Sequence, residues 1–240
     1  AEQLGVFSRD VLDSATVQLF LKMLRKKIKV FNIQFNKFGL IEPNSFQVTG
    51  KPTWVMDLIR DKNRMYNYYT PWFKKELNAS FNSKLMLLTG ISAQEFLLFL
   101  QNPNTAVSKP ITPAEIDQLK SILSYSVPKG SAIIYACYSP QNQMVAAGLF
   151  FSSHNHVFVP ILAIDEEYLS LHPLILIIHT FIYYNAGKNL TLVLENSINS
   201  KISNVIEKVG AEKKEYACIQ NNSLPWPLKK IKFHGTDLLQ

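Results

Sequence analysis

Residues 131–164, SAIIYACYSPQNQMVAAGLFFSSHNHVFVPILAI, decide the fold of this 240-residue chain. The stretch contains three apolar runs, residues 131–138, 144–151 and 157–164, which two short turn-rich segments separate. Apolar runs of strand length divided by such turns are typical of antiparallel hairpins. The stretch therefore predicts a three-stranded antiparallel meander.

Two helices and two strands are expected after the meander, at residues 171–186, 190–194, 201–209 and 214–219. Gly187 and Gly210 follow the two helices directly, and glycine readily adopts the left-handed conformation of a helix C-terminus. A short apolar strand after a long apolar helix is typical of a buried parallel crossover. The order predicts an α/β fold, a mixed (α+β) sheet with helices on both faces, in which strand 190–194 runs parallel to the last meander strand.

The first hundred residues carry shorter elements. We expect helices at residues 11–28, 61–80 and 92–100, the second of them interrupted, and strands at residues 30–35, 53–58 and 84–89. Ser14 is the candidate N-cap of the first helix. The segment 101–110, QNPNTAVSKP, is rich in turn-forming residues, and Thr112 opens a further helix. This pattern predicts two domains, residues 1–100 and 113–240, joined by a linker at residues 101–112.

The composition favours some partners and excludes some classes of protein. Lys and Arg outnumber Asp and Glu by 25 to 18, and the net charge of +7 favours a phosphorylated cofactor, a nucleic acid or an anionic membrane surface. The alternative is a solvated basic face that serves solubility. Cys137 and Cys218 lie in apolar runs, so we expect buried thiols and no disulfide scaffold. No apolar run approaches the roughly 18 to 20 residues of a membrane span, so we expect no membrane insertion and a cytoplasmic location.

Several strings of residues carry a resemblance to a known family. Residues 194–197 (LENS), 206–211 (IEKVGA) and 222–225 (NSLP), with Tyr216 before the last of them, look like the strand end, helix corner and tail of bacterial FemAB-like proteins. Residues 3–7 (QLGVF) resemble the first half of the same family. FemAB-like proteins carry two halves of the GNAT (acyl-CoA N-acyltransferase) fold, and the predicted order of elements is similar to that fold.

The resemblance implies both a fold and an activity. It implies a GNAT-like acyl-CoA N-acyltransferase fold in residues 113–240 and a partial second GNAT-like half in residues 1–100, inside which the sequence begins. Family members move an acyl group from acyl-CoA, or an aminoacyl group from charged tRNA, to an amine. We therefore expect an N-acyltransferase with a small-molecule acyl donor and an amine acceptor, with tRNA as the alternative donor.

Two residues are candidates for the acid–base chemistry. Glu195 is the first charged residue after the apolar strand 190–194, at the sheet edge where α/β proteins place ligands, so it is the candidate general base. Tyr216 matches a tyrosine of the family's last strand and is the candidate acid. The structural alternatives are that Glu195 caps or ion-pairs with the next helix, and that Tyr216 packs half-buried with its hydroxyl bonded.

Further residues are candidate contacts for the donor. Ile164, Ser170, Asn196 and Ser197 border the cleft expected between the two parallel strands, and Arg64, Lys74 and Lys75 would contact the donor's phosphates. Family members grip the pyrophosphate of CoA with a glycine-containing turn, whereas residues 165–173 contain three acids and no glycine. Carboxylates repel a pyrophosphate, so this turn argues against the usual contact with CoA. The alternative function is a catalytically degenerate GNAT-fold module that binds or assembles without CoA.

We expect no metal site at the histidines. His154 and His156 share one strand face but lie near a turn, without a neighbouring Cys or carboxylate motif, so we expect solvated side chains. His179 lies on an apolar helix and is expected to be a core histidine with its ring nitrogens satisfied.

Overall fold

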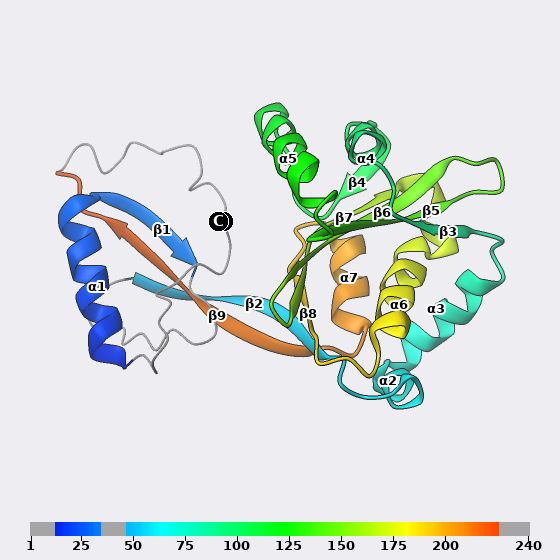
Figure 1. The fold of residues 1–240 in the computed structure, drawn as a ribbon, viewed down its shortest axis with the longest axis horizontal. Coiled ribbons are helices and arrows are strands. Elements are labelled where there is room, and N and C mark those ends of the chain that lie inside the picture. The colour runs from blue at the N-terminus through cyan, green and yellow to red at the C-terminus, as the bar shows by residue number, and fades with distance from the viewer. Residues whose placement is uncertain (1–12, 35–46, 226–240) are drawn as a thin grey trace. The chain divides into compact units, whose positions relative to one another are not determined.

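The computed structural model describes residues 13–34 and 47–225 and is shown as a ribbon in Figure 1. The chain divides into two compact units, one of residues 1–52 with 214–240 and one of residues 53–213. Strands β2 (Gln47–Asp57) and β9 (Glu212–Asn222) have residues in both units. The string at residues 3–7 lies outside the described residues.

In its described residues, the smaller unit contains helix α1, strand β1 and parts of β2 and β9. Helix α1 (Ser14–Lys27) is capped by Asp13, whose carboxylate accepts a hydrogen bond from the Thr16 N–H at 2.8 Å. The prediction of Ser14 as the cap was wrong, because the carboxylate one residue earlier reaches the free N–H groups of the first turn. Strand β1 (Val30–Gln34) pairs antiparallel with β9, and a small core contains Val17, Leu21 and Ile219.

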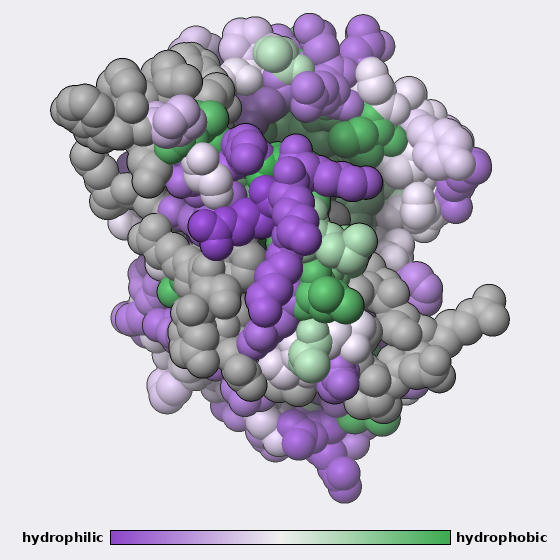
Figure 2. Space-filling model, turned by 90° about the vertical axis from the view of Figure 1, so that its left-hand side faces the viewer, coloured by the Kyte–Doolittle hydropathy of each residue, from purple (hydrophilic) through white to green (hydrophobic). Residues whose placement is uncertain are grey.

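The exposed surface of α1 is mixed in character. Leu19, Phe20 and Met23 are exposed apolar side chains. Arg25, Lys26 and Lys27 place positive charge in the last turn, where it complements the partial negative charge of the helix C-terminus. Figure 2 views the molecule from the side that carries α1 in Figure 1, and it shows hydrophilic and hydrophobic surface next to each other.

The larger unit confirms the predicted meander. Strands β5 (Ala132–Tyr138), β6 (Met144–Ser153) and β7 (His156–Asp165) pair antiparallel in chain order, and β3 (Met86–Thr89) pairs antiparallel with β5. Strand β8 (Thr191–Glu195) runs parallel to β7, as predicted, and β2 pairs antiparallel with β8. The sheet of the larger unit is therefore mixed, and its strands β2 and β3 come from the first hundred residues.

Helices cover both faces of this sheet (Figure 1). Helices α2 (Lys62–Tyr68), α3 (Pro71–Phe81), α6 (Pro173–Asn185) and α7 (Ser200–Lys208) pack on one face, and α4 (Ala93–Leu100) and α5 (Pro113–Ser126) pack on the other. The break between α2 and α3 confirms the interrupted helix. A 3-10 helix, η1 (Glu166–Leu171), joins β7 to α6. Each face of the sheet thus has its own apolar core.

The turn-rich segment 101–110 forms part of the sheet. It contains strand β4 (Thr105–Val107), which pairs antiparallel with β7. Two of its three residues are β-branched and suit a strand, and an edge of β7 offers backbone groups that need partners. Residues 101–112 lie inside the larger unit. The division of the chain into a partial and a complete GNAT-like half stays a prediction.

His179 of α6 lies in an aromatic cluster with residues of the α2–α3 segment. The Tyr69 hydroxyl and His179 Nδ1 are 3.1 Å apart, and the rings of Tyr69 and Phe81 lie edge-on to the imidazole. Burial lowers the pKa of His179 to about 4 and raises the pKa of Tyr69. The imidazole is therefore neutral at pH 7, and its Nδ1 accepts from the tyrosine hydroxyl in the tautomer that carries its proton on Nε2.

Both cysteines are buried free thiols, as the sequence predicts. Burial raises the pKa of the Cys137 thiol, which keeps that thiol protonated at pH 7. Within residues 13–34 and 47–225, no helix combines the length and the apolar character that crossing a bilayer requires.

We predict that Gly210→Ala destabilises the protein more than Gly187→Ala does. Gly210 has a φ of +92°, and a Cβ atom there would collide with the Tyr68 carbonyl oxygen. Gly187 has a φ of +83° but open space around it, so its substitution costs only the conformational part, about 1 kcal/mol. Urea unfolding of both variants measures the difference, and equal losses of unfolding free energy would contradict the prediction.

We also predict a stability loss in acid that depends on His179. Its pKa is about 4 in the folded chain and about 6.5 in an unfolded one, so unfolding takes up a proton between these values and stability falls as the pH decreases through this window. His179→Gln keeps an acceptor for Tyr69 and should show a shallower decline of the melting temperature from pH 7 to pH 4. His154→Gln, at an exposed turn, is the control and should keep the wild-type slope. The idea fails if the His179→Gln profile runs parallel to that of the wild type.

Candidate functional site

Strands β7 and β8 run side by side over a short distance only. Residues 156–159 of β7 pair with residues 191–194 of β8. Strand β8 then ends at Glu195, while β7 continues to Asp165. Strand β6 pairs with the opposite edge of β7 as far as Ile164. Beyond Val159, the edge of β7 that faced β8 therefore no longer has β8 as its partner. This is the position of the cleft expected between the two parallel strands, and a cleft lined by backbone N–H groups here would support acyl transfer.

Pro160 stands where the two strands part. It follows Val159, the last residue of β7 that pairs with β8, and proline has no N–H group for a further ladder bond. Its carbonyl oxygen lies 3.5 Å from the Ser108 hydroxyl, on the edge that β8 has left. Strand β7 therefore leaves β8 without creating an unsatisfied N–H at this residue.

The opened edge of β7 is occupied by the chain itself. Strand β4 pairs with residues 163–165 of β7. Ser108 then bonds both backbone groups of Leu162: its N–H donates to the Leu162 carbonyl at 2.8 Å, and its hydroxyl accepts from the Leu162 N–H at 3.2 Å. Residues 105–108 thus replace the ladder that β8 no longer provides.

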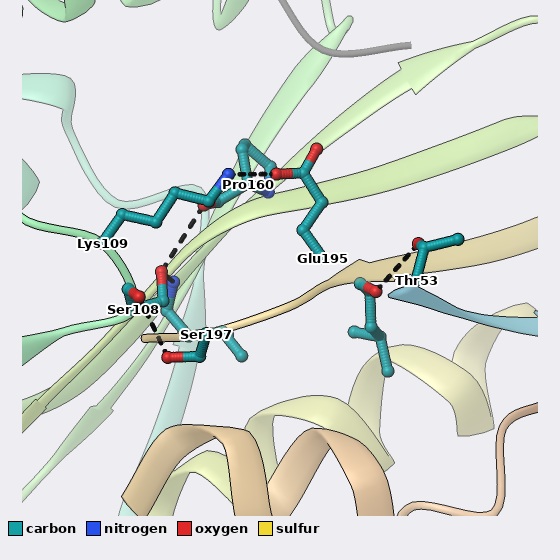
Figure 3. Close-up of polar contacts among 8 residues, drawn as sticks. Thr53, Ser108, Lys109, Pro160, Glu195 and Ser197 are labelled. Atoms are coloured by element: carbon teal, nitrogen blue, oxygen red, sulfur yellow. Dashed lines mark hydrogen bonds and ion pairs between the residues drawn. The ribbon is translucent and has the colours of Figure 1, made fainter. Parts of the chain in front are cut away.

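The same segment is tied to the loop that follows β8 (Figure 3). The Ser108 carbonyl accepts hydrogen bonds from the Ile198 N–H at 3.1 Å and from the Ser197 hydroxyl at 3.0 Å. Residues 105–108 therefore bridge β7 and the end of β8. They occupy the place between the parted strands in which a donor is expected.

Glu195 and Lys109 form an ion pair beside this segment (Figure 3). The Glu195 Oε2 and Lys109 Nζ atoms are 2.5 Å apart, and the two side chains are 9% and 30% exposed. The opposite charges of the two groups attract each other at this distance. The ion pair that the sequence offered as the structural alternative therefore exists, but its cation comes from Lys109 rather than from the next helix. That helix, α7, is capped by the side chain of Asn199.

The predicted donor contacts near Glu195 have partners within the chain. Ile164 is buried in β7 and pairs with β4, and Ser197 is buried with its hydroxyl bonded to the 105–108 segment. Asn196 is exposed, and Ser170 lies in η1. Ile164 pairs with Ala106, Glu195 contacts Lys109 and Ser197 contacts Ser108, so all three lie against residues 105–109.

The predicted phosphate contacts, Arg64, Lys74 and Lys75, lie in α2 and α3. Asp57 near the start of α2 pairs with Thr191, the first residue of β8, whereas Glu195 is the last residue of that strand. Helix α2 therefore begins at the opposite end of β8 from the carboxylate. The structure does not bring Arg64 and Glu195 together.

Tyr216, the candidate acid, is a buried residue of β9 and belongs to the smaller unit. Glu195 belongs to the larger unit. The pairing of these two residues as acid and base stays a prediction.

The turn after β7 contains three acidic residues, and two of them lie around one hollow in the structure. Asp165, Glu166 and Glu167 lead into η1, and the Asp165 carboxylate accepts a hydrogen bond from the Glu167 N–H at 3.1 Å. Asp165 and Glu167 line an open hollow of about 480 Å³ together with Glu95. Carboxylates around one hollow repel phosphate groups. In the part of the chain that the structure describes, no three His, Cys, Asp or Glu side chains are grouped to hold a metal ion.

Sequence reasoning missed Ser108 and Lys109. Both residues lie in a segment read as a linker, and their partners Pro160 and Glu195 are 52 and 86 residues away along the chain. No local pattern names a partner at such a separation. Pro160 itself was a usable signal, because a proline inside an apolar strand marks a place where pairing on one edge ends.

No protein-family model matches the chain, and a search of curated proteins gives no match. Among solved structures, FemX matches with a TM-score of 0.59 at 8% identity, over 88% of this chain and 78% of that chain. A functionally unknown conserved protein from Staphylococcus epidermidis matches with a TM-score of 0.53 at 10% identity, over 93% and 83% of the two chains. L-PGS from Bacillus licheniformis matches with a TM-score of 0.53 at 11% identity, over 88% and 74%. At these identities the likeness shows the fold alone: the chain has a mixed α/β fold like that of FemX.

We predict that Glu195 and Lys109 are energetically coupled. Glu195→Gln and Lys109→Met should each lower the free energy of unfolding by about 1–3 kcal/mol, because each leaves a poorly solvated group without its charged partner. The double variant should lose less than the sum, with a coupling energy on the order of 1 kcal/mol in urea unfolding. The exposed pair Lys201–Glu166, with an N–O distance of 2.9 Å, is the matched control and should show almost no coupling. Strict additivity at Glu195 and Lys109 would show that the ion pair has no net effect.

Proposed function

We propose that the chain is a GNAT-fold binding or assembly module that does not hold acyl-CoA along β7. The observation that carries this proposal is the pairing of β4 with residues 163–165 of β7. In acyl transfer, backbone N–H groups of the cleft polarise the donor's carbonyl, and they must be unpaired to do so. In this chain, residues 105–108 already occupy that edge of β7.

Displacing the segment would be costly. Each backbone hydrogen bond contributes about 0.5–1.5 kcal/mol, and leaving a buried partner unsatisfied costs more. Ser108 alone engages Leu162 on one side and Ile198 on the other. A donor that took this place would have to replace the ladder of β4 and both of these contacts.

The charge of the neighbouring turn supports the same proposal. A CoA pyrophosphate would approach η1 past Asp165, Glu166 and Glu167, and none of the residues 165–173 is a glycine that opens N–H groups toward it. The Lys201–Glu166 ion pair neutralises one of the three acids only in an exposed contact. Repulsion therefore adds to the occupied edge.

The Glu195–Lys109 pair supports a second candidate, N-acyl transfer from a donor that does not lie along β7. A carboxylate at the end of a buried strand is placed to accept the proton of an attacking amine. In this candidate an aminoacyl-tRNA is the donor and Glu195 is the base. Acyl-CoA as the donor requires that β4 leaves its place.

Calorimetric titration of the full chain with CoA, acetyl-CoA and tRNA tests the proposal. We expect no saturable binding of CoA or acetyl-CoA at about 1 mM, the upper end of common KM values. Ala106→Pro, which removes an N–H from the middle of β4, should make CoA binding measurable if the occupied edge is what excludes the donor. Saturable binding of acetyl-CoA to the wild type would overturn the proposal, and binding of tRNA without CoA would favour the second candidate.

A further inference from the structure

A group of tyrosines and cations lies on α2, on the residues just before it, on α3 and at the C-terminal end of α6, and Figure 1 shows these helices next to one another. Three cations lie over tyrosine rings: Arg60 over Tyr68 at 4.3 Å, Lys62 over Tyr183 at 3.9 Å, and Lys74 over Tyr66 at 5.2 Å from the ring centroid. These six residues are called the tyrosine surface below. Each of its three positive charges lies over a tyrosine ring.

The positive charges of this surface are only weakly compensated. Among the residues that the structure describes, Arg60, Lys62 and Lys74 have no carboxylate within ion-pair distance. A cation–π contact at an exposed site contributes about 0.5–1 kcal/mol and leaves the net charge unchanged. The rings thus position the cations while the charges stay available to an anionic partner.

Ring contacts connect two of the three tyrosines of this surface, Tyr66 and Tyr183. Tyr66 contacts Tyr69, with 5.7 Å between the centroids, and Tyr69 contacts His179 at 5.7 Å. The same imidazole contacts Tyr183 at 5.9 Å and Phe81 at 5.7 Å. Tyr66 and Tyr183, more than a hundred positions apart in the sequence, are therefore linked through the part-buried Tyr69–His179 contact.

We propose that the tyrosine surface docks on an anionic lipid bilayer. Tyrosine carries a polar hydroxyl on an apolar ring and prefers the headgroup level of a membrane, and lysine and arginine are attracted to anionic headgroups. At the margin of the surface, Phe81, Tyr184 and Ile59 are 58%, 64% and 58% exposed. These apolar groups can enter the interface while the cations contact lipid phosphates.

The same features favour a lipid surface over a nucleic acid. Stacking of bases requires open ring faces, whereas one face of Tyr66, Tyr68 and Tyr183 is covered by a cation. An exposed aliphatic side chain such as Ile59 cannot stack on a nucleic-acid base, but it can contact the acyl chains of lipids.

The inference does not rest on the function proposed above. Helix α2 begins at the N-terminal end of β8, and Glu195 lies at the C-terminal end of the same strand. Docking through the tyrosine surface therefore involves neither the ion pair of Glu195 nor the edge of β7, and its test is independent of CoA binding.

Co-sedimentation of the full chain with vesicles tests the inference. We expect binding to vesicles of phosphatidylcholine with phosphatidylglycerol, weakened by added salt, and no binding to phosphatidylcholine alone. The variant Arg60→Gln/Lys62→Gln/Lys74→Gln should lower the partition coefficient by about 100-fold, the combined effect expected of three surface cations. Wild-type binding by this variant would overturn the inference.

The matched control removes the same charge elsewhere. Lys120, Lys129 and Lys213 are exposed, and the last two also lie over aromatic rings, those of Tyr125 and Trp54. Changing all three to Gln should leave vesicle binding close to that of the wild type. An equal loss in both triple variants would show that net charge alone acts, and the tyrosine surface would have no role.

A third variant separates aromatic from electrostatic contributions. Phe81→Ser/Tyr184→Ser keeps the net charge and should also lower vesicle binding, whereas unchanged binding would overturn the part of the inference that concerns the aromatic margin.

Fluorescence anisotropy with single-stranded RNA tests whether the surface binds a nucleic acid instead of a bilayer. If the chain binds RNA through Arg60, Lys62 and Lys74 and does not bind anionic vesicles, the surface is a nucleic-acid interface and the inference is wrong.

Discussion

Pro160 has no N–H group, and the organisation of the candidate site follows from this constraint. Strand β7 stops pairing with β8 at this residue but continues to Asp165, so its edge must find other partners. Residues 105–108 supply them and are fastened in turn to the loop after β8. The place where related folds are expected to admit a donor is thereby part of the sheet.

The ion pair of Glu195 is a consequence of the same arrangement. A carboxylate that emerges from a buried strand needs either water or a cation, and Lys109 directly follows the segment that covers the edge of β7. Glu195 is thus open to two interpretations: it is a structural partner of the residues that follow β4, or it is a catalytic base. A double-mutant comparison distinguishes an energetic coupling from mere proximity, since it measures the interaction between the two groups directly.

The meander, the apolar crossover helix and the parallel strand were all predictable, because their periodicity and their glycine stops are local signals. The acidic, glycine-free turn was also visible in the sequence. Strand β4 was not predictable: three residues, Thr105–Val107, between turn formers carry no local periodicity, and only an edge made by distant residues turns them into a strand. For the same reason Lys109 could not be assigned to Glu195, while Asp13 replaced Ser14 as a cap through a difference of one position.

The strand that covers β7 also affects how any ligand of that edge would be measured. Such a ligand binds only the fraction of molecules in which residues 105–108 have moved away, so its apparent dissociation constant is the intrinsic constant divided by that fraction. If the open form is one molecule in about a hundred, a micromolar ligand is observed as roughly a hundred-fold weaker. Conditions or variants that shift this equilibrium would change the apparent affinity without altering a single direct contact to the ligand.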